Sequence, residues 1–317
     1  MSGDGEFVTA FAPASIGNVA VGFDMLGLAI SGAGDRVSAR RTRGDEIVIR
    51  AVYGLDGKPH SGLSTVVDEN TAGVAAAALW RAHGEGGLEL EIHKGVPLQS
   101  GTGSSAASAV AGVVAANALL AAPLAPADLV EYALAGEQVA SGSVHADNVA
   151  PSLLGGLVLC PPALLPRVVA LPVPRGVSSV LLHPDLTVST AESRRGLARG
   201  YSMEQWLEQQ GYLAGFVAAC AADDHDLLAR CLRDVVVEPQ RKSAVPCFDA
   251  VQAAALASRA FGCSLSGSGP SLFALCADAD AANVATAMEQ ACRAQGYDCE
   301  SWISPMASPG ARVERSA

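Results

Sequence analysis

The chain has 317 residues, of which half are hydrophobic and 17% are charged, so it holds enough apolar material for one large domain or two medium ones. Its formal net charge is −11, with 32 acidic against 21 basic residues, and this balance excludes the basic face of a nucleic-acid-binding protein. No apolar run reaches the ~20 residues that a membrane helix needs, and the N-terminus lacks the basic segment of a signal peptide.

The eight cysteines are scattered along the chain, and no two of them form a CxxC pair. Several lie among Ala, Leu and Val, as Cys276 does in FALCAD. This spacing is typical neither of a metal site nor of a compact disulfide framework. We therefore expect reduced, mostly buried thiols in a cytoplasmic protein.

The first half of the chain combines alternating apolar segments, typical of strands, with alanine-rich segments typical of helices. The polar stretch SGSVHADN, which follows them, is typical of a loop. The pattern predicts strands at 6–12, 25–30, 35–41, 46–52 and 87–94, and helices at 69–83, 104–121 and 127–141.

A break at Pro161 and Pro162 is the best candidate for a domain boundary. Strands clustered early, then helices, then a final β-turn-β-α-β unit favour an α+β fold over a doubly wound one. We expect the residues after Pro305 to form a flexible tail. Around and beyond the break, the pattern predicts strands at 155–160, 166–171, 177–183, 263–266, 271–277 and 298–303, and helices at 202–222, 224–234, 247–260 and 280–295.

A glycine- and serine-rich loop, VPLQSGTGSSAASAVAG at 96–112, opens a long alanine-rich helix. Gly101 and Gly103 allow backbone conformations that other residues rarely adopt. Ser104 and Ser105 lie at the start of the predicted helix. A helix N-terminus offers unpaired N–H groups, so the loop could bind phosphate, and a serine hydroxyl there could bind Mg²⁺. An ordinary turn with an N-cap would leave the same pattern. The loop is neither a Walker A motif nor the GxGxxG of a dinucleotide-binding unit.

Two further loops place polar residues or glycines in apolar surroundings. In PASIGNVAVGFDMLGLAI (13–30), Asn18 and Asp24 could hold an ammonium group, or they could cap turns between two strands. In CSLSGSGPSLFAL (263–275), the glycines could let the backbone approach a ligand, or they could simply connect a hairpin.

Glu137 shares a predicted helix face with Val130 and Leu134. An unpaired charge on such an apolar stripe is costly. Coordination of Mg²⁺ would remove the cost, and a salt bridge is the alternative.

Five more polar residues follow that helix. His145, Asp147 and Asn148 come directly after it in HADN, and Arg194 and Arg241 lie in the second half of the chain. A lone histidine is more often structural, and isolated arginines usually lie at the surface. Arginine nevertheless suits bidentate binding of a carboxylate.

Together, these segments resemble the small-molecule kinase superfamily that includes galactokinase, mevalonate kinase and homoserine kinase. Its phosphate loop reads Pro-x-x-x-Gly-Leu-Gly-Ser-Ser-Ala, and the segment from Pro97 to Ala106 differs mainly by Thr102 in the leucine position. The other two loops and HADNVAPSLLGG are similar to the homoserine kinase branch. The similarity runs in order over nearly the whole chain.

The resemblance implies the activity and the fold. The reaction would be phosphorylation of the side-chain hydroxyl of L-homoserine to O-phospho-L-homoserine, a step in threonine biosynthesis, with ATP and Mg²⁺. The fold would comprise an N-terminal ATP-binding domain of the ribosomal-S5-domain-2 type (1–165) and a ferredoxin-like domain (166–317). A homodimer is implied as well.

The resemblance also assigns roles to matching positions. Ser105 and Glu137 would bind Mg²⁺, and Lys94 could touch the nucleotide. The catalytic residues would be Asn148, Arg194 and His145. Homoserine would be held by Asn18, Asp24, His145, Asn148, Arg194 and Arg241, with the arginines on its carboxylate and Asp24 on its amine. ATP would be bound by Asn70, Pro97, Leu98, Gln99, Ser100, Gly101, Thr102, Gly103, Ser104, Ser105, Ala106 and Ala107.

The mechanism implied by the resemblance lacks a carboxylate base. Mevalonate-kinase-like members have an aspartate near the acceptor hydroxyl, whereas the matching residue here is Asn148, which cannot accept a proton at neutral pH. The hydroxyl would be aligned by Asn148 and lose its proton late, with Asp147 as the rival base. A kinase for another small alcohol and a non-catalytic metabolite-binding relative remain open as alternatives.

Overall fold

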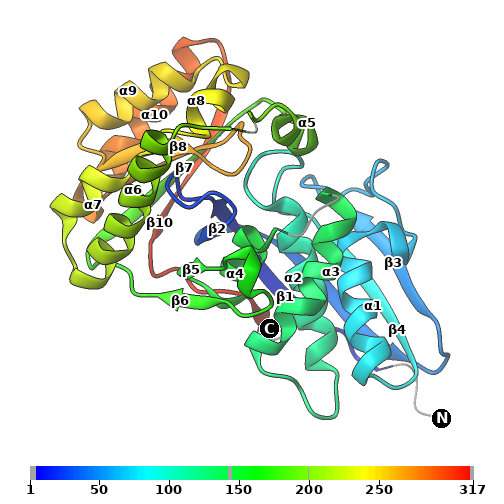
Figure 1. Cartoon of the computed structure of the whole chain (residues 1–317). Coiled ribbons are helices and arrows are strands. Elements are labelled where there is room, and N and C mark those ends of the chain that lie inside the picture. Colours follow the sequence, from blue (N-terminus) through cyan, green and yellow to red (C-terminus); the bar gives the residue numbers. More distant parts are fainter. Residues whose placement is uncertain (1–4, 142–144, 199, 315–317) are drawn as a thin grey trace.

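The computed structural model describes residues 5–141, 145–198 and 200–314, and it contains two β-sheets covered by helices (Figure 1). The first sheet has seven strands in the order β11-β1-β2-β4-β3, with β5 paired to β2 and β6 paired to β5. Its strands are β1 (Val8–Gly17), β2 (Leu26–Thr42), β3 (Ile47–Tyr53), β4 (Gly87–His93), β5 (Leu157–Leu159), β6 (Val169–Leu171) and β11 (Arg312–Glu314).

The two faces of this sheet follow the alternation of its sequence. Val37 and Ala39 of β2 and Leu90 of β4 are fully buried in the core under the helices. Arg40, which alternates with them, instead pairs across the strands with Glu89 of β4 at 2.9 Å. The pattern therefore fixes which face of the sheet meets the helices.

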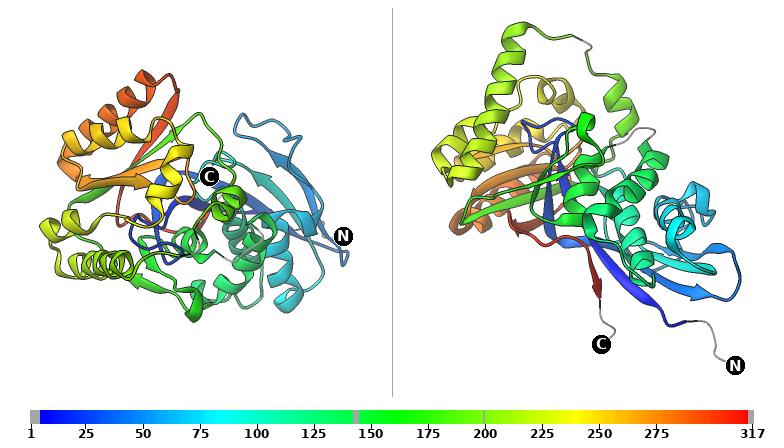
Figure 2. Two further views of the ribbon diagram at one scale, coloured as in Figure 1. Left: turned by 45° about the horizontal axis from the view of Figure 1, so that its top comes forward. Right: turned by 60° about the horizontal axis from the view of Figure 1, so that its bottom comes forward.

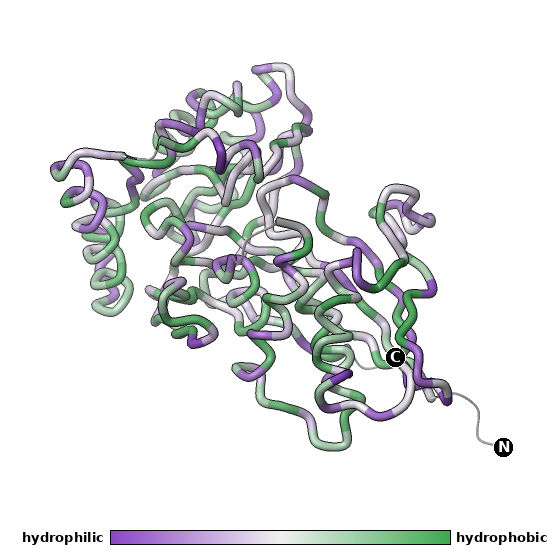
Figure 3. The backbone as a smooth tube through the Cα atoms, turned by 45° about the vertical axis from the view of Figure 1, so that its right-hand side comes forward, coloured by the Kyte–Doolittle hydropathy of each residue, from purple (hydrophilic) through white to green (hydrophobic). Residues whose placement is uncertain are grey.

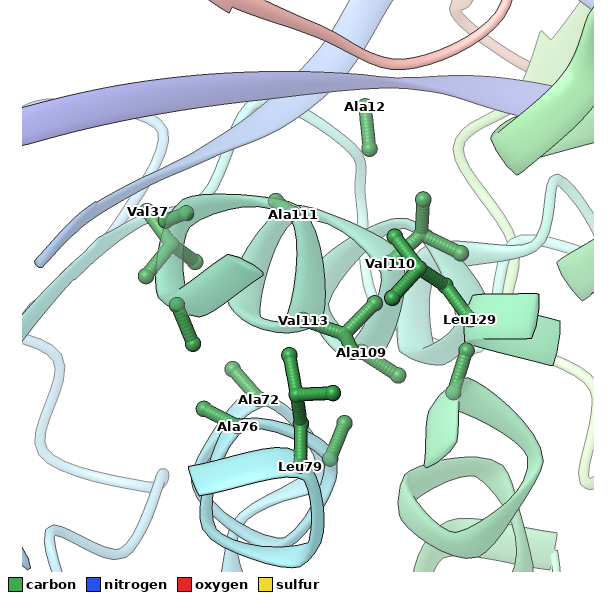
Figure 4. Packing of buried hydrophobic residues seen from close by; sticks show 14 of the residues in the cluster. Ala12, Val37, Ala72, Ala76, Leu79, Ala109, Val110, Ala111, Val113 and Leu129 are labelled. Carbon is green, nitrogen blue, oxygen red and sulfur yellow. The ribbon is translucent and has the colours of Figure 1, made fainter. Parts of the chain in front are cut away.

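Small residues let the helices of the first half pack closely on the sheet and on one another. Figure 4 shows Ala72 and Leu79 of one helix facing Val113 of the next. A Cβ added at Gly112 would lie 2.6 Å from the carbonyl oxygen of Ala72, so glycine is required at this crossing. The helices are α1 (Thr71–His83), α2 (Ser104–Ala118), α3 (Val130–Ser141) and α4 (Ala146–Leu154).

The second sheet has the strand order β10-β7-β9-β8. Helices α9 and α10 pack on one face, and the chain order β7, α9, β8, β9, α10, β10 is the ferredoxin-like βαββαβ arrangement. The expected α+β class with a ferredoxin-like second half is confirmed. Its elements are β7 (Val177–Pro184), α9 (Phe248–Ala257), β8 (Gly262–Leu265), β9 (Leu272–Ala277), α10 (Ala281–Ala294) and β10 (Cys299–Pro305).

Further helices lie between β7 and α9, and some of them reach the first half. Phe216 of α6 is fully buried in a core cluster that also contains Ile16 of β1 and Phe273 of β9, so this cluster joins the two sheets. The helices are α5 (Thr190–Arg195), α6 (Met203–Ala222), α7 (His225–Cys231) and α8 (Glu238–Arg241). Short 3-10 turns lie at Val67–Glu69, Pro126–Leu129, Pro162–Leu164, Lys242–Ala244 and Asp278–Asp280. Figure 3 shows hydrophobic and hydrophilic residues alternating along much of the backbone, with some of the hydrophilic stretches in outer loops.

The prediction of a flexible tail after Pro305 is wrong. Met306 is fully buried, and β11 pairs with β1 at the edge of the first sheet. Glu314 accepts hydrogen bonds from Nε and Nη2 of Arg36 at 2.8 and 3.1 Å. The chain thus returns from the second sheet to the first, and Figure 2 (right) shows this last strand descending toward the same end as β1.

Two other expectations meet the structure near the middle of the chain. HADN, expected in a loop, forms the start of α4, and residues 142–144 lie outside the described residues. The proposed boundary between 165 and 166 falls between β5 and β6, which pair in one sheet, and it stays a prediction. Over the described ranges, no helix is long and apolar enough to cross a membrane.

Candidate active site

A cleft of about 470 Å³ lies where the three loops of the sequence analysis meet. Both halves of the chain contribute to its walls. Four predicted ATP-binding residues are absent from the lining: Pro97, Thr102, Ala106 and Ala107. The other predicted site residues all line it: Asn18, Asp24, Asn70, Leu98, Gln99, Ser100, Gly101, Gly103, Ser104, Ser105, Glu137, His145, Asn148, Arg194 and Arg241.

The glycine–serine loop ends at the first residue of α2. Gly103 is the N-cap and has a left-handed backbone, with φ at 71°. The first helical bond runs from the amide of Ala107 to the carbonyl oxygen of Gly103 at 2.9 Å, so the amides of Ser104 and Ser105 precede the hydrogen-bond ladder of the helix. Both serines line the cleft, and the arrangement suits an anion.

Lys94 holds the start of α2 in place through an ion pair and two hydrogen bonds. Its ammonium group forms a buried ion pair with Asp35 and donates to the carbonyl oxygen of Ser104 at 3.0 Å and to Oγ of Ser108 at 2.8 Å. These three acceptors match its three N–H donors. Lys94 therefore holds the loop in place, and no N–H of its ammonium group is left for a nucleotide.

The third loop clamps the phosphate loop from the second half of the chain. The hydroxyl of Ser266 donates to the carbonyl oxygen of Gly101 at 2.7 Å, and the hydroxyl of Ser271 donates to that of Ser100 at 2.7 Å. A Cβ added at Gly101 would lie 2.6 Å from the carbonyl oxygen of Ser266. The two loops thus form one interlocked unit.

If the glycine–serine loop binds ATP, as the resemblance implies, replacing Ser266 by Ala should raise the KM for ATP about two- to tenfold, because one hydrogen bond that orients the loop is lost. Steady-state kinetics with varied ATP measure this effect. Ser301→Ala is the matched control, since this serine bonds Glu289 in the same half of the chain and does not line the cleft. An unchanged KM in Ser266→Ala would contradict the clamping role.

Asn18 joins the second loop to the third. Its Nδ2 donates to the carbonyl oxygen of Gly267 at 2.9 Å, and its Oδ1 accepts from the amide of Asp24 at 3.0 Å. Arg241 donates to the same Gly267 carbonyl oxygen at 3.0 Å. Asn18 therefore orders the site in addition to lining it.

Asp24 and Arg194 pair directly across the cleft. Nη2 of Arg194 lies 2.6 and 2.8 Å from the two carboxylate oxygens of Asp24. The resemblance placed these residues on the amine and the carboxylate of one ligand. In the structure the two groups form an ion pair with each other.

Two buried carboxyl groups, those of Glu137 and Asp147, line the cleft. Burial, with the charge of Asp147 added, raises the pKa of Glu137 from 4.5 to about 7, against a hydrogen bond from Ser105. Burial and the nearby charge of Asp24 raise the pKa of Asp147 from 3.8 to about 7. A divalent cation would relieve this clustering of negative charge.

His145 and Asn148 enter the site at the start of α4. Burial and the charge of Arg194 lower the pKa of His145 from 6.5, which favours the neutral imidazole. Oδ1 of Asn148 accepts a hydrogen bond from Ser15 at 3.0 Å, and Nδ2 points to Asp147 at 3.5 Å. The amide of Asn148 is thus held in a defined orientation.

Sequence reasoning missed part of the cleft lining, which includes the apolar side chains of Leu63, Ile92 and Val139. Asn70 caps α1 through the amides of Ala72 and Gly73 and donates to the carbonyl oxygen of Ser64 at 2.9 Å, so its polar atoms have protein partners. Apolar contacts carry no distinctive residue-type signal, which explains the omission. Further lining residues here are Gly62, Leu63, Ser64, Thr71, Ile92 and Val139.

The fold and the cleft define a class of small-molecule kinases. The family descriptions "GHMP kinases N terminal domain" and "GHMP kinases C terminal" match residues 70–156 and 216–294. Homoserine kinases from Xylella fastidiosa (strain M12) and Xanthomonas campestris pv. campestris (strain B100) are 45% identical over 96% of this chain and 93% of theirs. The crystal structure of homoserine kinase from Cytophaga hutchinsonii superimposes with a TM-score of 0.92 at 38% identity, covering 97% of each chain. The chain belongs to the homoserine kinase family of the GHMP kinases.

Proposed function

We propose that the cleft binds ATP and L-homoserine together and transfers the γ-phosphate to the side-chain hydroxyl, with the residues named above in the roles given below. Homoserine kinase activity, an ATP-dependent step of threonine biosynthesis, is the activity of the family to which the chain belongs. The observation that carries the proposal is the convergence of a phosphate-type helix start with Asp24 and two arginines in one cleft.

The phosphates of ATP would lie on the start of α2. The amides of Ser104 and Ser105 are outside the hydrogen-bond ladder of the helix, and the helix dipole adds a partial positive charge there. Phosphoryl transfer depends mainly on positioning and charge neutralisation. Clamping of this loop by Ser266 and Ser271 therefore contributes to catalysis by holding the amides in place.

The residues present fit a magnesium ion. Glu137 is a buried carboxylate of raised pKa, and a hydroxyl of the helix start, that of Ser105, hydrogen-bonds to it. No cluster of three or more His, Cys, Asp or Glu side chains able to hold a metal occurs in the part of the chain that the structure describes. This suits Mg²⁺, which usually takes few protein ligands beside phosphate oxygens and water. Bound there by Ser105 and Glu137, it would neutralise phosphate charge.

The cleft would recognise the acceptor by the charged groups of an amino acid. Arg194 and Arg241 would bind its carboxylate, and Asp24 its ammonium group. The proposal is supported by the closeness of Asp24 and Arg194, because the two charged ends of one small amino acid could reach both. His145 and Asn148 would then face the side chain that carries the hydroxyl.

Asp147→Asn should lower kcat by less than tenfold, because in the proposed mechanism the hydroxyl loses its proton late and no carboxylate abstracts it. The substitution is isosteric, which matters since Cβ positions at Gly17 and Gly27 lie against this residue. Single-turnover kinetics and a melting curve test it. A fall of several orders of magnitude in a folded variant would establish Asp147 as the base.

A panel of acceptors tests the proposed function. ADP release should be followed with L-homoserine, L-serine, L-threonine, mevalonate and galactose. Selective turnover of homoserine supports the proposal, and turnover of only a sugar or mevalonate would overturn it. Ligand binding in calorimetry without any ADP release would indicate a non-catalytic relative.

The assembly and the location remain predictions. The family resemblance predicts a homodimer, which light scattering can measure. The eight cysteines, none of them in a CxxC pair, predict a cytoplasmic location.

A further inference from the structure

Phe23 lies beneath the two arginines of the site. The guanidinium carbon of Arg194 is 5.4 Å from the centre of its ring, and that of Arg241 is 5.2 Å from the same centre. Both distances are within the range of cation–π contacts. Phe23 is half-buried and does not line the cleft, so it contacts the arginines rather than the space in which a ligand would lie.

The charges of the two arginines repel each other, and the nearby carboxyl groups of Asp24, Asp234 and Asp147 offset the effects of burial and repulsion on Arg241 only in part. Arg194 pairs with the carboxylate of Asp24, whereas the buried Arg241 donates a hydrogen bond to a neutral carbonyl oxygen, that of Gly267. Burial and the charge of Arg194 lower the pKa of Arg241. In the described residues, the Nε atoms of both arginines are buried without a hydrogen-bond partner.

We infer that Phe23 is a positioning residue that gathers Arg194 and Arg241 into one receptor for the carboxylate of the substrate. The electron-rich face of the ring attracts both cations and offsets their mutual repulsion. It also fixes the planes of both guanidinium groups, on which bidentate binding of a carboxylate depends. The inference rests on the proposed function, in which the substrate is an amino acid.

The loop that carries Phe23 is built to hold it. Asn18 has a left-handed backbone with φ at 67°, as does Asp24 with φ at 57°. The hydrogen bond from the amide of Asp24 to the side chain of Asn18 closes the turn around Phe23. The ring is therefore fixed relative to both Asp24 and the third loop, which Asn18 also contacts.

Three variants at Phe23 test whether the aromatic ring acts through cation–π attraction or only through apolar packing. Phe23→Leu and Phe23→Ala should both raise the KM for homoserine about tenfold or more, and Phe23→Tyr should stay within about threefold of the wild-type protein. The KM for ATP should change by less than about twofold in all three. The measurement is steady-state kinetics with each substrate varied in turn, after melting curves have confirmed folding.

Phe11→Leu provides a matched control. The ring of Phe11 also contacts two arginines, but it lies on the first sheet and does not line the cleft. The guanidinium carbons of Arg36 and Arg312 are 5.0 and 4.4 Å from the centre of this ring. Its kinetic constants should equal those of the wild-type protein.

Two outcomes would overturn the inference alone. One is a Phe23→Leu variant whose KM for homoserine equals that of the wild-type protein. The other is a Phe23→Leu variant whose KM for homoserine lies well below that of Phe23→Ala, which would mean that apolar packing suffices. A wild-type protein that does not phosphorylate homoserine would overturn the proposed function instead, and the inference with it.

Discussion

Glu137→Gln is expected to lower kcat about a thousandfold at saturating ATP, which corresponds to ~4 kcal/mol of lost transition-state stabilisation. The amide keeps the shape of the side chain but removes the negative charge that would hold Mg²⁺ beside Ser105. The Mg²⁺ concentration for half-maximal activity should rise as well. Initial rates over a magnesium titration measure both effects.

The loss should not come from unfolding. Because the pKa of Glu137 is raised from 4.5 to about 7, the folded chain favours the protonated form, and ionisation costs stability as the pH rises through this interval. The amide avoids that cost, so the variant should melt at or above the wild-type temperature at pH 8. Glu131→Gln, at an exposed position of the same helix, is the matched control. A kcat within tenfold of wild type in Glu137→Gln would contradict the metal role.

Gly103→Ala is expected to lower kcat/KM for ATP at least ~100-fold. With φ at +71°, an alanine there pays roughly 1–2 kcal/mol for the left-handed backbone. Its Cβ would lie 2.4 Å from Oγ of Ser15 and 3.0 Å from Oδ1 of Asn148. Ser15 of β1, the phosphate loop or the start of α4 must then shift, and Ser15 itself holds the amide of Asn148. Kinetics and urea unfolding measure the two consequences.

Gly57→Ala separates backbone strain from steric contact. Gly57 has φ at +72°, and nothing lies within 4 Å of its added Cβ. We expect a stability loss of about 1 kcal/mol and unchanged kinetics. If Gly103→Ala behaved like Gly57→Ala, the close approach of the phosphate loop to Asn148 would not be required for activity.

The phosphate loop could be predicted because its signal is local. Glycines with left-handed backbones, serines and an alanine-rich helix lie in one short segment, and the structure places Gly101 to Ser105 at the start of α2 or just before it. The N-cap of α5 is a local signal of the same kind, because Ser189 accepts a hydrogen bond from the amide of Glu192, three residues further on.

Contacts between distant segments could not be predicted in the same way. Asn18 bonds Gly267 across 249 positions, and Phe23 meets two arginines from the second half of the chain. The last strand also pairs with the first, although its three residues carry no distinctive pattern. Such pairings depend on the complete fold, so local periodicity and residue type do not reveal them.

Local patterns also misjudged some element boundaries. Strands predicted at 25–30 and 35–41 form one continuous strand, β2, although residues 30–33 have no partners in β1, where the register shifts between Pro13 and Ser15. The irregular stretch contacts the second sheet instead, since the amide of Ser31 donates to Oγ of Ser304 at 2.7 Å. The composition of HADN is typical of a loop, yet this segment forms the start of α4. The start of α4 packs against Gly17 and Gly27, where the lack of side chains leaves room for it. Tertiary packing overrode local preference at both places.

The most direct test of the central claim is the identity of the product. The wild-type protein should be incubated with ATP, Mg²⁺ and L-homoserine, and the reaction followed by phosphorus NMR. We predict one new phosphomonoester whose phosphorus couples to the two protons of the side-chain carbon that carries the oxygen, formed in equal amount with ADP. Release of inorganic phosphate alone, or a phosphate on any other group of the acceptor, would contradict the account.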